Sequence, residues 1–391
     1  MRRRTRSPLS SPPPPPPRSG PDRRSLLRAA AAGSLGLTLT GCAYIPHAES
    51  DAAAAVDAEP PLPMEVDGPL VYFNWADYID PTVKAGFSEE YGVEVIESNF
   101  DSMESMIAKM DAGNTYDIIF PSAKWTQLLW QGGQLHKLPL HLLRNGDAVF
   151  AHYGYFDNPW YDPGSAHSVP FTMYKTGIGW RKDKLGELTG SWRDMWDGTA
   201  TGRAFLLDDR DEVLGFASLQ LGCGAYAVGH EQLDRMASLV QNLRPRLRAF
   251  DSDDYDNLLN GDAWLTQAWS GDMTSVVQQA KDPSVYGFEA AKEGAPVNTD
   301  CYAIPANAQH PGTAMLFIDY MLRPENVARN IAYIGYPMPV HGSEHGYEQL
   351  VSTLPDCVVT EQDLAANLVF TNGTPAQEAA RDACWTNIQA G

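Results

Sequence analysis

Short apolar runs alternate with four-residue apolar spacings along the chain. Leu70 to Phe73 is such a run, and Val83, Phe87 and Tyr91 follow it at four-residue spacing after Asp80-Pro81. An aspartate before a first-turn proline is typical of a helix start, and the four-residue spacing is typical of one buried helical face. The segment from Leu70 to Tyr91 is therefore predicted to be a strand followed by a helix.

The same alternation continues through the rest of the chain. Val93 to Ile96 and Tyr116 to Phe120 read as strands, and between them a methionine-rich stripe that includes Met103, Met106 and Met110 predicts a helix with its methionines in the core. Further predicted strands, in a second set beyond Asp157, are Ile178 to Trp180, Ala204 to Leu207 and Ala263 to Trp269, with a helix from about Leu233 to Leu243. Alternating strands and helices imply parallel strands joined by crossovers, hence an α/β fold with helices on the faces of its sheets.

The first 41 residues are typical of an export signal. A proline run, residues 12–17, precedes the arginine pair Arg23-Arg24, and the weakly apolar stretch from Ala29 to Thr40 is too short to span a bilayer. The arginine pair resembles a twin-arginine signal, and Leu39-Thr40-Gly41-Cys42 resembles a lipobox. We therefore expect export, lipidation of Cys42, and anchoring at the outer face of the cytoplasmic membrane, in the periplasm or cell-wall space. Residues 42–67 are predicted to be a flexible tether, with the fold starting near Gly68.

Charge and length narrow the function classes. The chain has 391 residues and a formal net charge of −20, although its first residues are rich in arginine. Such acidity argues against binding to nucleic acid or to anionic lipid, and it favours attraction of cations. The residues beyond the signal suffice for two domains, and no later apolar run approaches membrane-spanning length.

Four cysteines follow Cys42, an even number for an oxidising compartment. Their spacings are unlike those of a zinc site, and they allow three pairings. One or two disulfides are expected, and the pair that we predict is Cys357 with Cys384.

Candidate binding residues stand immediately after the predicted strands. In open parallel sheets, ligands bind outside the carboxyl ends of the strands. The residues found there are mainly aromatic or acidic: Trp75, Asp77, Tyr78, Ser122, Asp208, Asp209, Glu212 and Trp269. This mixture suits an elongated organic cation, whose ammonium groups need carboxylates and whose methylenes pack on aromatic faces. A sugar also stacks on aromatics, but these positions are short of the cations and amides that meet its hydroxyls. Aromatics there can equally be packing residues, and the acidic pair can simply cap a helix.

Several longer motifs resemble one family, the spermidine/putrescine-binding proteins of ABC importers. They include residues 72–78 (YFNWADY), 116–122 (YDIIFPS), 208–212 (DDRDE), 303–308 (AIPANA), 322–324 (LRP) and 334–337 (IGYP). The resemblance implies a two-lobed periplasmic-binding-protein fold of type II, each lobe a mainly parallel sheet flanked by helices, with a ligand cleft between the lobes. It places residues 68–172 and 300–340 in one lobe and residues 173–299 and 341–391 in the other. Hinged closure about residues 171–176, 296–301 and 337–341 is then expected.

The resemblance also implies a set of ligand contacts. Trp75, Tyr78, Trp269 and Tyr336 would be aromatic walls, Ser122 a polar contact, Asp209 and Glu212 amine partners, and Asp300 the central carboxylate. It implies no cofactor, no metal and no catalysis. The expected partners are a polyamine or a related small cation, a membrane permease with its ATPase subunits, and the membrane through the lipid, with the receptor itself a monomer.

The chain departs from the family pattern at two positions. Asn298 stands where the family typically has an aromatic residue two positions before the central aspartate, and Lys124 stands where a tyrosine is frequent. Lys124 would repel a polycation unless its side chain turns to solvent, whereas the neighbouring Trp125 could supply the missing aromatic face. Asn298, Lys124 and Trp125 are therefore the residues expected to alter the ligand specificity.

Three alternatives stay open on the sequence. Asp209 and Glu212 beside tryptophans could be the acid pair of a glycoside hydrolase, but no additional motif for a nucleophile, metal or phosphate accompanies them. A structural or adhesive surface lipoprotein would explain the tether and the acidity without a ligand. The same receptor fold could also bind another solute, such as a different amine or an amino-acid derivative.

Overall fold

The computed structural model describes residues 62–100, 102–150, 154–366 and 368–390. The predicted export signal, Cys42 and most of the predicted tether lie outside these ranges. The described residues form one compact unit. Within the described ranges, no helix is both long and apolar enough to cross a bilayer.

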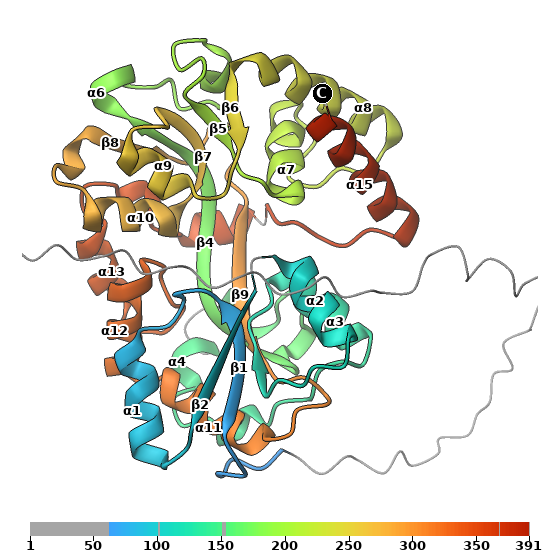
Figure 1. Cartoon of the computed structure of the whole chain (residues 1–391), viewed down its shortest axis with the longest axis vertical. Helices are drawn as coiled ribbons and strands as arrows, with labels where there is room; N and C mark the ends of the chain where they lie inside the picture. Colours follow the sequence, from blue (N-terminus) through green and yellow to red (C-terminus); the bar gives the residue numbers. More distant parts are fainter. Residues whose placement is uncertain (1–61, 101, 151–153, 367, 391) are drawn as a thin grey trace, which may run out of the picture. The chain divides into compact units, whose positions relative to one another are not determined.

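The described strands form one sheet with the order β2-β1-β3-β9-β4-β7-β5-β6, and β8 pairs with β4 (Figure 1). Their bounds are β1 (Leu70–Trp75), β2 (Val95–Phe100), β3 (Ile118–Ile119), β4 (Ser168–Arg181), β5 (Ala204–Leu206), β6 (Leu247–Phe250), β7 (Leu265–Trp269), β8 (Tyr286–Glu289) and β9 (Val297–Ala303). β1 runs parallel to β2 and β3, and β5 runs parallel to β6 and β7. The predicted crossover-linked parallel strands are confirmed in both places.

Two strands join these parallel groups. β4 pairs antiparallel with β9 from Ser168 to Lys175 and then antiparallel with β7 from Thr176 to Trp180. The predicted crossing segments 171–176 and 296–301 therefore lie in β4 and in or next to β9. We call the elements around β1, β2 and β3 the first half and the elements around β5, β6, β7 and β8 the second half.

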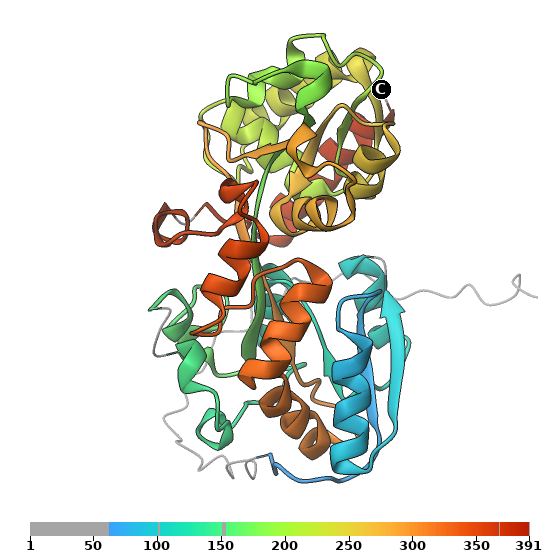
Figure 2. The same cartoon turned by 90° about the vertical axis from the view of Figure 1, so that its left-hand side faces the viewer.

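Helices cover both faces of the sheet (Figures 1 and 2). Their bounds are α1 (Pro81–Tyr91), α2 (Met103–Asp111), α3 (Ala123–Gln131), α4 (Asp147–Phe150), α5 (Gly154–Asp157), α6 (Lys182–Leu185), α7 (Arg210–Gln220), α8 (His230–Leu243), α9 (Asp254–Asn260), α10 (Ser270–Gln279), α11 (Pro311–Met321), α12 (Pro324–Ile334), α13 (Glu344–Leu350), α14 (Glu361–Ala366) and α15 (Pro375–Ala390).

The first half buries alternate residues of its strands on opposite faces. Tyr72 of β1 packs in a cluster with Phe87 of α1 and with residues of α11 and α12, whereas its neighbour Phe73 packs with Met106 of α2 and Leu129 of α3. Asp80 caps α1 as predicted, because its Oδ1 accepts a 2.7 Å hydrogen bond from Thr82 N. The methionine stripe of α2 contributes to the core, as predicted.

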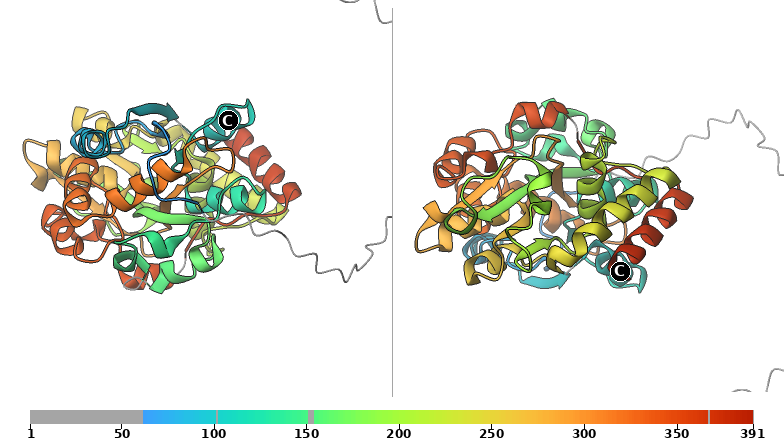
Figure 3. Two further views of the ribbon diagram at one scale, coloured as in Figure 1. Left: turned by 90° about the horizontal axis from the view of Figure 1, so that it is seen from below. Right: turned by 90° about the horizontal axis from the view of Figure 1, so that it is seen from above.

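The second half has its own core between α7, α8 and α15. Leu206 of β5, Phe216 of α7 and Met236 of α8 are buried in one cluster, which also receives Ile388 of α15. α15 lies alongside α8 (Figure 3) and also packs on α7. The last helix of the chain is therefore part of the second half.

Residues predicted to belong to the tether already contact the folded part. Leu62 is buried in the large core cluster, and the Asp67 carboxylate accepts hydrogen bonds of 2.9 Å from the backbone N–H groups of Gly312 and Thr313 at the start of α11. A carboxylate at a helix N-terminus satisfies free N–H donors and the helix dipole. The folded part therefore begins before Gly68.

The predicted disulfide between Cys357 and Cys384 is wrong, because both thiols are free in the structure. Cys357 is buried in the large core cluster, whereas Cys384 of α15 belongs to the cluster of the second half. The Cys384 thiol instead donates to Leu233 O at 3.4 Å. Burial raises the pKa of both thiols, which disfavours the thiolate needed for disulfide exchange.

This arrangement predicts a count of thiols. A Cys42→Ser variant, denatured without reductant, is expected to react with a thiol reagent at four positions, the free cysteines Cys223, Cys301, Cys357 and Cys384. Each disulfide would remove two reactive thiols, so a count of two or none would contradict the structure. The same assay after reduction gives the reference value.

Candidate functional site

Asp300 on β9 is the centre of the first group of polar side chains. Its Oδ2 accepts a 2.9 Å hydrogen bond from the Tyr78 hydroxyl, which is also 2.9 Å from Thr172 Oγ1 on β4. The backbone of Asp300 forms an isolated bridge with Ser122, the residue before α3. Asp300 is only 4% exposed, so three separate segments enclose this carboxylate together with its own strand.

Glu212 in the first turn of α7 is the centre of the second group. Its Oε1 accepts hydrogen bonds from Trp269 Nε1 at 2.8 Å and from Thr176 Oγ1 at 3.0 Å. Its Oε2 is buried without a hydrogen-bond partner among the described residues. Asp209 caps the same helix, because its Oδ1 accepts from Glu212 N at 2.9 Å. Asp209 therefore has the capping role that the sequence left open, while holding its carboxylate next to Glu212.

Aromatic rings connect the two carboxylate groups. The Tyr78 ring stands edge-on to Tyr336 at 5.4 Å, Tyr336 stands edge-on to Tyr174 at 5.6 Å, and Tyr174 is 6.5 Å from Trp269. Tyr78 hydrogen-bonds Asp300 and Trp269 hydrogen-bonds Glu212, so the row of rings leads from one carboxylate to the other. Such a row provides faces for a hydrocarbon chain and ends in acceptors for cationic groups.

Gly271 permits this close packing. It lies in the first turn of α10, and a Cβ at this position would come within 2.2 Å of Tyr336 Cδ2. Any larger residue would push the Tyr336 ring away from the row.

Burial raises the pKa of each carboxyl group in the site. The pKa of Asp300 is raised to about 7 by burial, against the opposing hydrogen bonds of Tyr78 and Thr172. Burial, followed by the charge of Asp209, raises the pKa of Glu212 to about 8. Burial, followed by the charge of Asp211, raises the pKa of Asp209 to about 6. Among the described residues, no lysine, arginine or histidine forms an ion pair with these three groups, so a cation from outside would stabilise their ionised forms.

A further carboxylate pair lies beside Tyr336 and was missed by sequence reasoning. The Tyr336 hydroxyl donates to Asp272 Oδ1 at 2.8 Å. Burial raises the pKa of Asp272, and burial together with Asp272 raises the pKa of Asp254. The signal for Asp272 was available, because it follows the predicted strand end at Trp269 by three residues. Asp254 is distant in sequence, and only the packing of α9 on α10 brings it there.

Two of the predicted tryptophans lie in another environment. Trp75 packs on Phe100 at a ring distance of 4.7 Å, and both Trp75 and Trp125 pack against the cluster of Phe73 and Met106 in the first half. Asn298 lies closer to the row of rings, because its Nδ2 donates to the Tyr174 hydroxyl at 3.0 Å. The structure thus brings together Tyr78, Asp209, Glu212, Trp269, Asp300 and Tyr336, with the backbone of Ser122 next to Asp300.

Lys124 does not turn to solvent. It is 4% exposed, and its Nζ lies 2.8 Å from Asp211 Oδ2 and 3.0 Å from Glu378 Oε2. The expected repulsion of a cation is therefore moderated by carboxylates rather than by solvent.

Metal ligation was not predicted from the sequence. In the parts of the chain that the structure describes, no group of three or more histidine, cysteine, aspartate or glutamate side chains is arranged to hold a metal ion.

These features define a class of protein. Two groups of parallel strands, joined by crossing strands and contributing side chains to one buried site, form a two-lobed binding-protein fold. The chain belongs to the family of bacterial extracellular solute-binding proteins, whose family model matches residues 82–348. This family is a class of binding proteins, so the glycoside hydrolase alternative is excluded.

Known relatives and structures agree with this family. The chain is 31% identical over 275 residues to the spermidine/putrescine-binding periplasmic protein of Salmonella typhimurium, covering 69% of this chain and 77% of that protein. It is 29% identical over 350 residues to the putrescine-binding periplasmic protein PotF of Escherichia coli, covering 82% and 91%. The TpPotD lipoprotein of Treponema pallidum has a similar fold, with a TM-score of 0.73 at 24% identity over 82% of this chain and 100% of that chain.

Proposed function

We propose that this protein is the substrate-binding component of an ABC importer and that it captures a polyamine at the site between its two halves. Carboxylates at the two ends of the row of rings would pair with ammonium groups, and the rings would pack on the methylenes between them. The names of the relatives, a spermidine/putrescine-binding and a putrescine-binding protein, support this ligand class.

The observation that carries the proposal is the arrangement of Asp300 and Glu212. Both are almost fully buried, both have a raised pKa, and the row Tyr78-Tyr336-Tyr174-Trp269 lies between them. Burying carboxylates without cationic partners is unfavourable for folding. A dication with an apolar middle would compensate both ends at once.

The proposed ligand set keeps all but one of the residues predicted from the sequence and adds one position. Asp300, Glu212 and Asp209 would be ammonium partners, and Tyr78, Trp269 and Tyr336 would provide ring faces. Ser122 would contact the ligand from the first half, and Trp75 is the one predicted contact left out, because it packs on Phe100. Asp272 would add a carboxylate next to Tyr336, since it already accepts a hydrogen bond from that hydroxyl.

Anchoring and delivery form the outer part of the proposal. A lipid on Cys42 would hold the receptor at the membrane, and a closed receptor would deliver its solute to a permease driven by ATPase subunits. Closure would follow from ligand contacts made to both halves, with β4, β9 and residues 337–341 as the connecting segments. Met173 N of β4 already donates to Pro337 O at 3.0 Å.

The first experiment is calorimetric titration of the full chain, purified in detergent, with putrescine, spermidine and spermine. Saturable binding of at least one polyamine with a micromolar or lower Kd is the expected result. A parallel thermal-shift screen with amino acids, sugars and betaines tests the other solutes. If none of the three polyamines binds and another solute raises the melting temperature, polyamine capture is refuted and the receptor binds that solute instead.

A further inference from the structure

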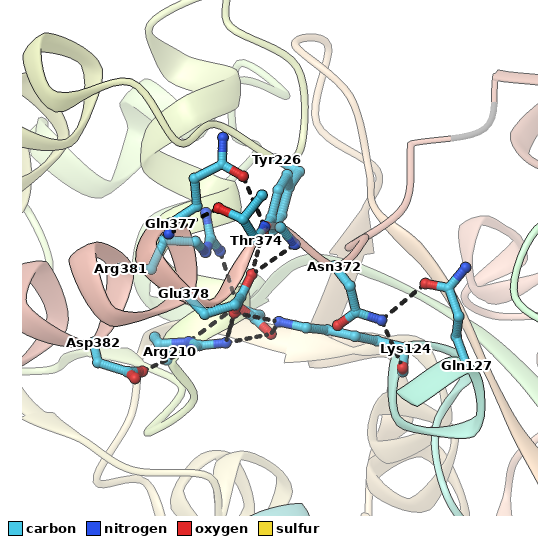
Figure 4. A network of polar contacts seen from close by, with 12 residues as sticks. Lys124, Gln127, Arg210, Tyr226, Asn372, Thr374, Gln377, Glu378, Arg381 and Asp382 are labelled. Carbon is cyan, nitrogen blue, oxygen red and sulfur yellow. Dashed lines mark hydrogen bonds and ion pairs between the residues drawn. The ribbon is translucent and has the colours of Figure 1, made fainter. Parts of the chain in front are cut away.

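One cluster of charged residues joins the two halves outside the row of rings. We call Lys124, Arg210, Asp211, Glu378 and Arg381 the interlobe ion cluster. Lys124 is on α3 of the first half, whereas its carboxylate partners are on α7 and α15 of the second half. Figure 4 shows the Lys124 side chain extended toward Glu378 and Arg210.

Several contacts hold the cluster together. Arg381 Nη2 donates to Asp211 Oδ1 at 2.8 Å, and Arg210 Nη2 donates to Glu378 Oε2 at 2.8 Å. The Tyr226 hydroxyl donates to Glu378 Oε1. The loop before α15 adds a second link between the halves, because Asn372 Nδ2 donates to Lys124 O at 2.9 Å. Lys124 is thus fixed in place along its backbone as well as at its ammonium group.

The charges in this cluster are matched. Lys124, Arg210 and Arg381 supply three cations, and Asp211 and Glu378 face them together with Asp382, which pairs with Arg210. Burial alone would raise the pKa of Asp211, but the charges of Lys124, Arg381 and Arg210 lower it. No carboxylate charge in the cluster is left over for a further cation.

The cluster adjoins the proposed ligand site. Asp211 lies between Asp209 and Glu212 in the sequence, and its charge contributes to the raised pKa of both. Lys124 lies two residues beyond Ser122, whose backbone bridges Asp300, and its ammonium pairs with the first turn of α7, which also carries Glu212. It therefore bridges the halves next to the site through carboxylates, in the way that a ligand ammonium would.

We propose that Lys124 is a specificity-determining residue whose ammonium takes the place of a ligand ammonium at the Asp211 and Glu378 end of the site, so that the receptor prefers diamines to triamines. This inference rests on the proposed function. A third ligand ammonium entering this end would meet the Lys124 charge, with the nearby carboxylates already paired. The two ammonium groups of a diamine would pair only with Asp300 and with the carboxylates at the Glu212 end of the row of rings.

The test compares the Kd of putrescine, with two charges, and spermidine, with three, by calorimetry of the full chain. Wild type is expected to bind putrescine more tightly. Lys124→Met removes the charge and keeps the length, and it is expected to shift the ratio of the two Kd values toward spermidine by roughly tenfold, the value of one charge-assisted contact. Lys124→Arg retains the charge and is expected to keep the wild-type preference.

Lys84→Met is the matched control, because the Lys84 ammonium pairs with a carboxylate, that of Glu97, at 2.6 Å but lies on α1 outside the cluster. It should leave the ratio unchanged. Wild type that binds spermidine more tightly than putrescine overturns the inference without any variant. An equal change of both Kd values in Lys124→Met also overturns it, while the proposed function stands. If wild type binds neither putrescine nor spermidine, the inference is overturned, and the proposed function is refuted with it when spermine does not bind either.

Discussion

Replacing Asp300 by asparagine is expected to weaken polyamine binding by roughly 1.5–3 kcal/mol, which is about 10- to 150-fold in Kd. The asparagine keeps the shape of the side chain and removes the charge that would pair with a ligand ammonium. Calorimetric titration of the variant and wild type at pH 8 measures the effect, because Asp300, with a pKa of about 7, is mostly ionised there.

A second measurement separates loss of a ligand contact from loss of structure. Burial raises the pKa of Asp300, so its ionised form destabilises the folded protein without ligand. Asp300→Asn is therefore expected to have a melting temperature at pH 8 no lower than that of wild type. Asp183→Asn is the control, because Asp183 pairs with Arg181 at the surface. An unchanged Kd in Asp300→Asn would remove this residue from the site.

The sequence correctly predicted those strands and helices in which apolar residues recur at a regular spacing. β1, α1 and α8 have regular apolar spacing, and each appears close to its predicted position. β4 was recognised only at Ile178 to Trp180, because all of its residues except the last are buried and it contains Pro170, Gly177 and Gly179. A strand of this kind shows neither a period of two nor a sharp end.

The site was predicted best where the topology alone determines the position of a residue. Tyr78 and Asp209 follow strands, and Trp269 ends one, whose carboxyl ends point to the junction of the two halves, so the pattern was sufficient. Tyr174 and Thr176 were missed because they belong to β4, where the antiparallel pairing with β9 and β7 places them in the site. The surroundings of Lys124 depend on Asp211 and Glu378, which are 87 and 254 residues away. No local pattern could have predicted that contact.

The three site carboxyls also determine how ligand binding depends on pH. Asp209, Asp300 and Glu212 have pKa values raised to about 6, 7 and 8, with burial as the largest cause in each case. Without ligand these groups therefore take up protons as the pH falls through this range, and a protonated carboxyl cannot pair with an ammonium group. Amines resembling lysine stay charged below about pH 10, so the change comes from the protein.

Polyamine affinity is accordingly expected to rise from pH 5.5 to pH 8.5. Below the pKa of a group, each proton that binding must release costs roughly tenfold in Kd per pH unit. Calorimetry at pH 7 in two buffers with different ionisation enthalpies should show protons released on binding. The Glu212→Gln variant should no longer release the proton that Glu212 loses on binding up to about pH 8. Its affinity for the polyamine is also expected to be lower than that of wild type. A contradicting result would be a Kd that is constant from pH 5.5 to pH 8.5 together with a binding enthalpy that is the same in both buffers. Protonation of the three carboxyl groups would then not be linked to ligand binding, so these groups would not pair with the ligand.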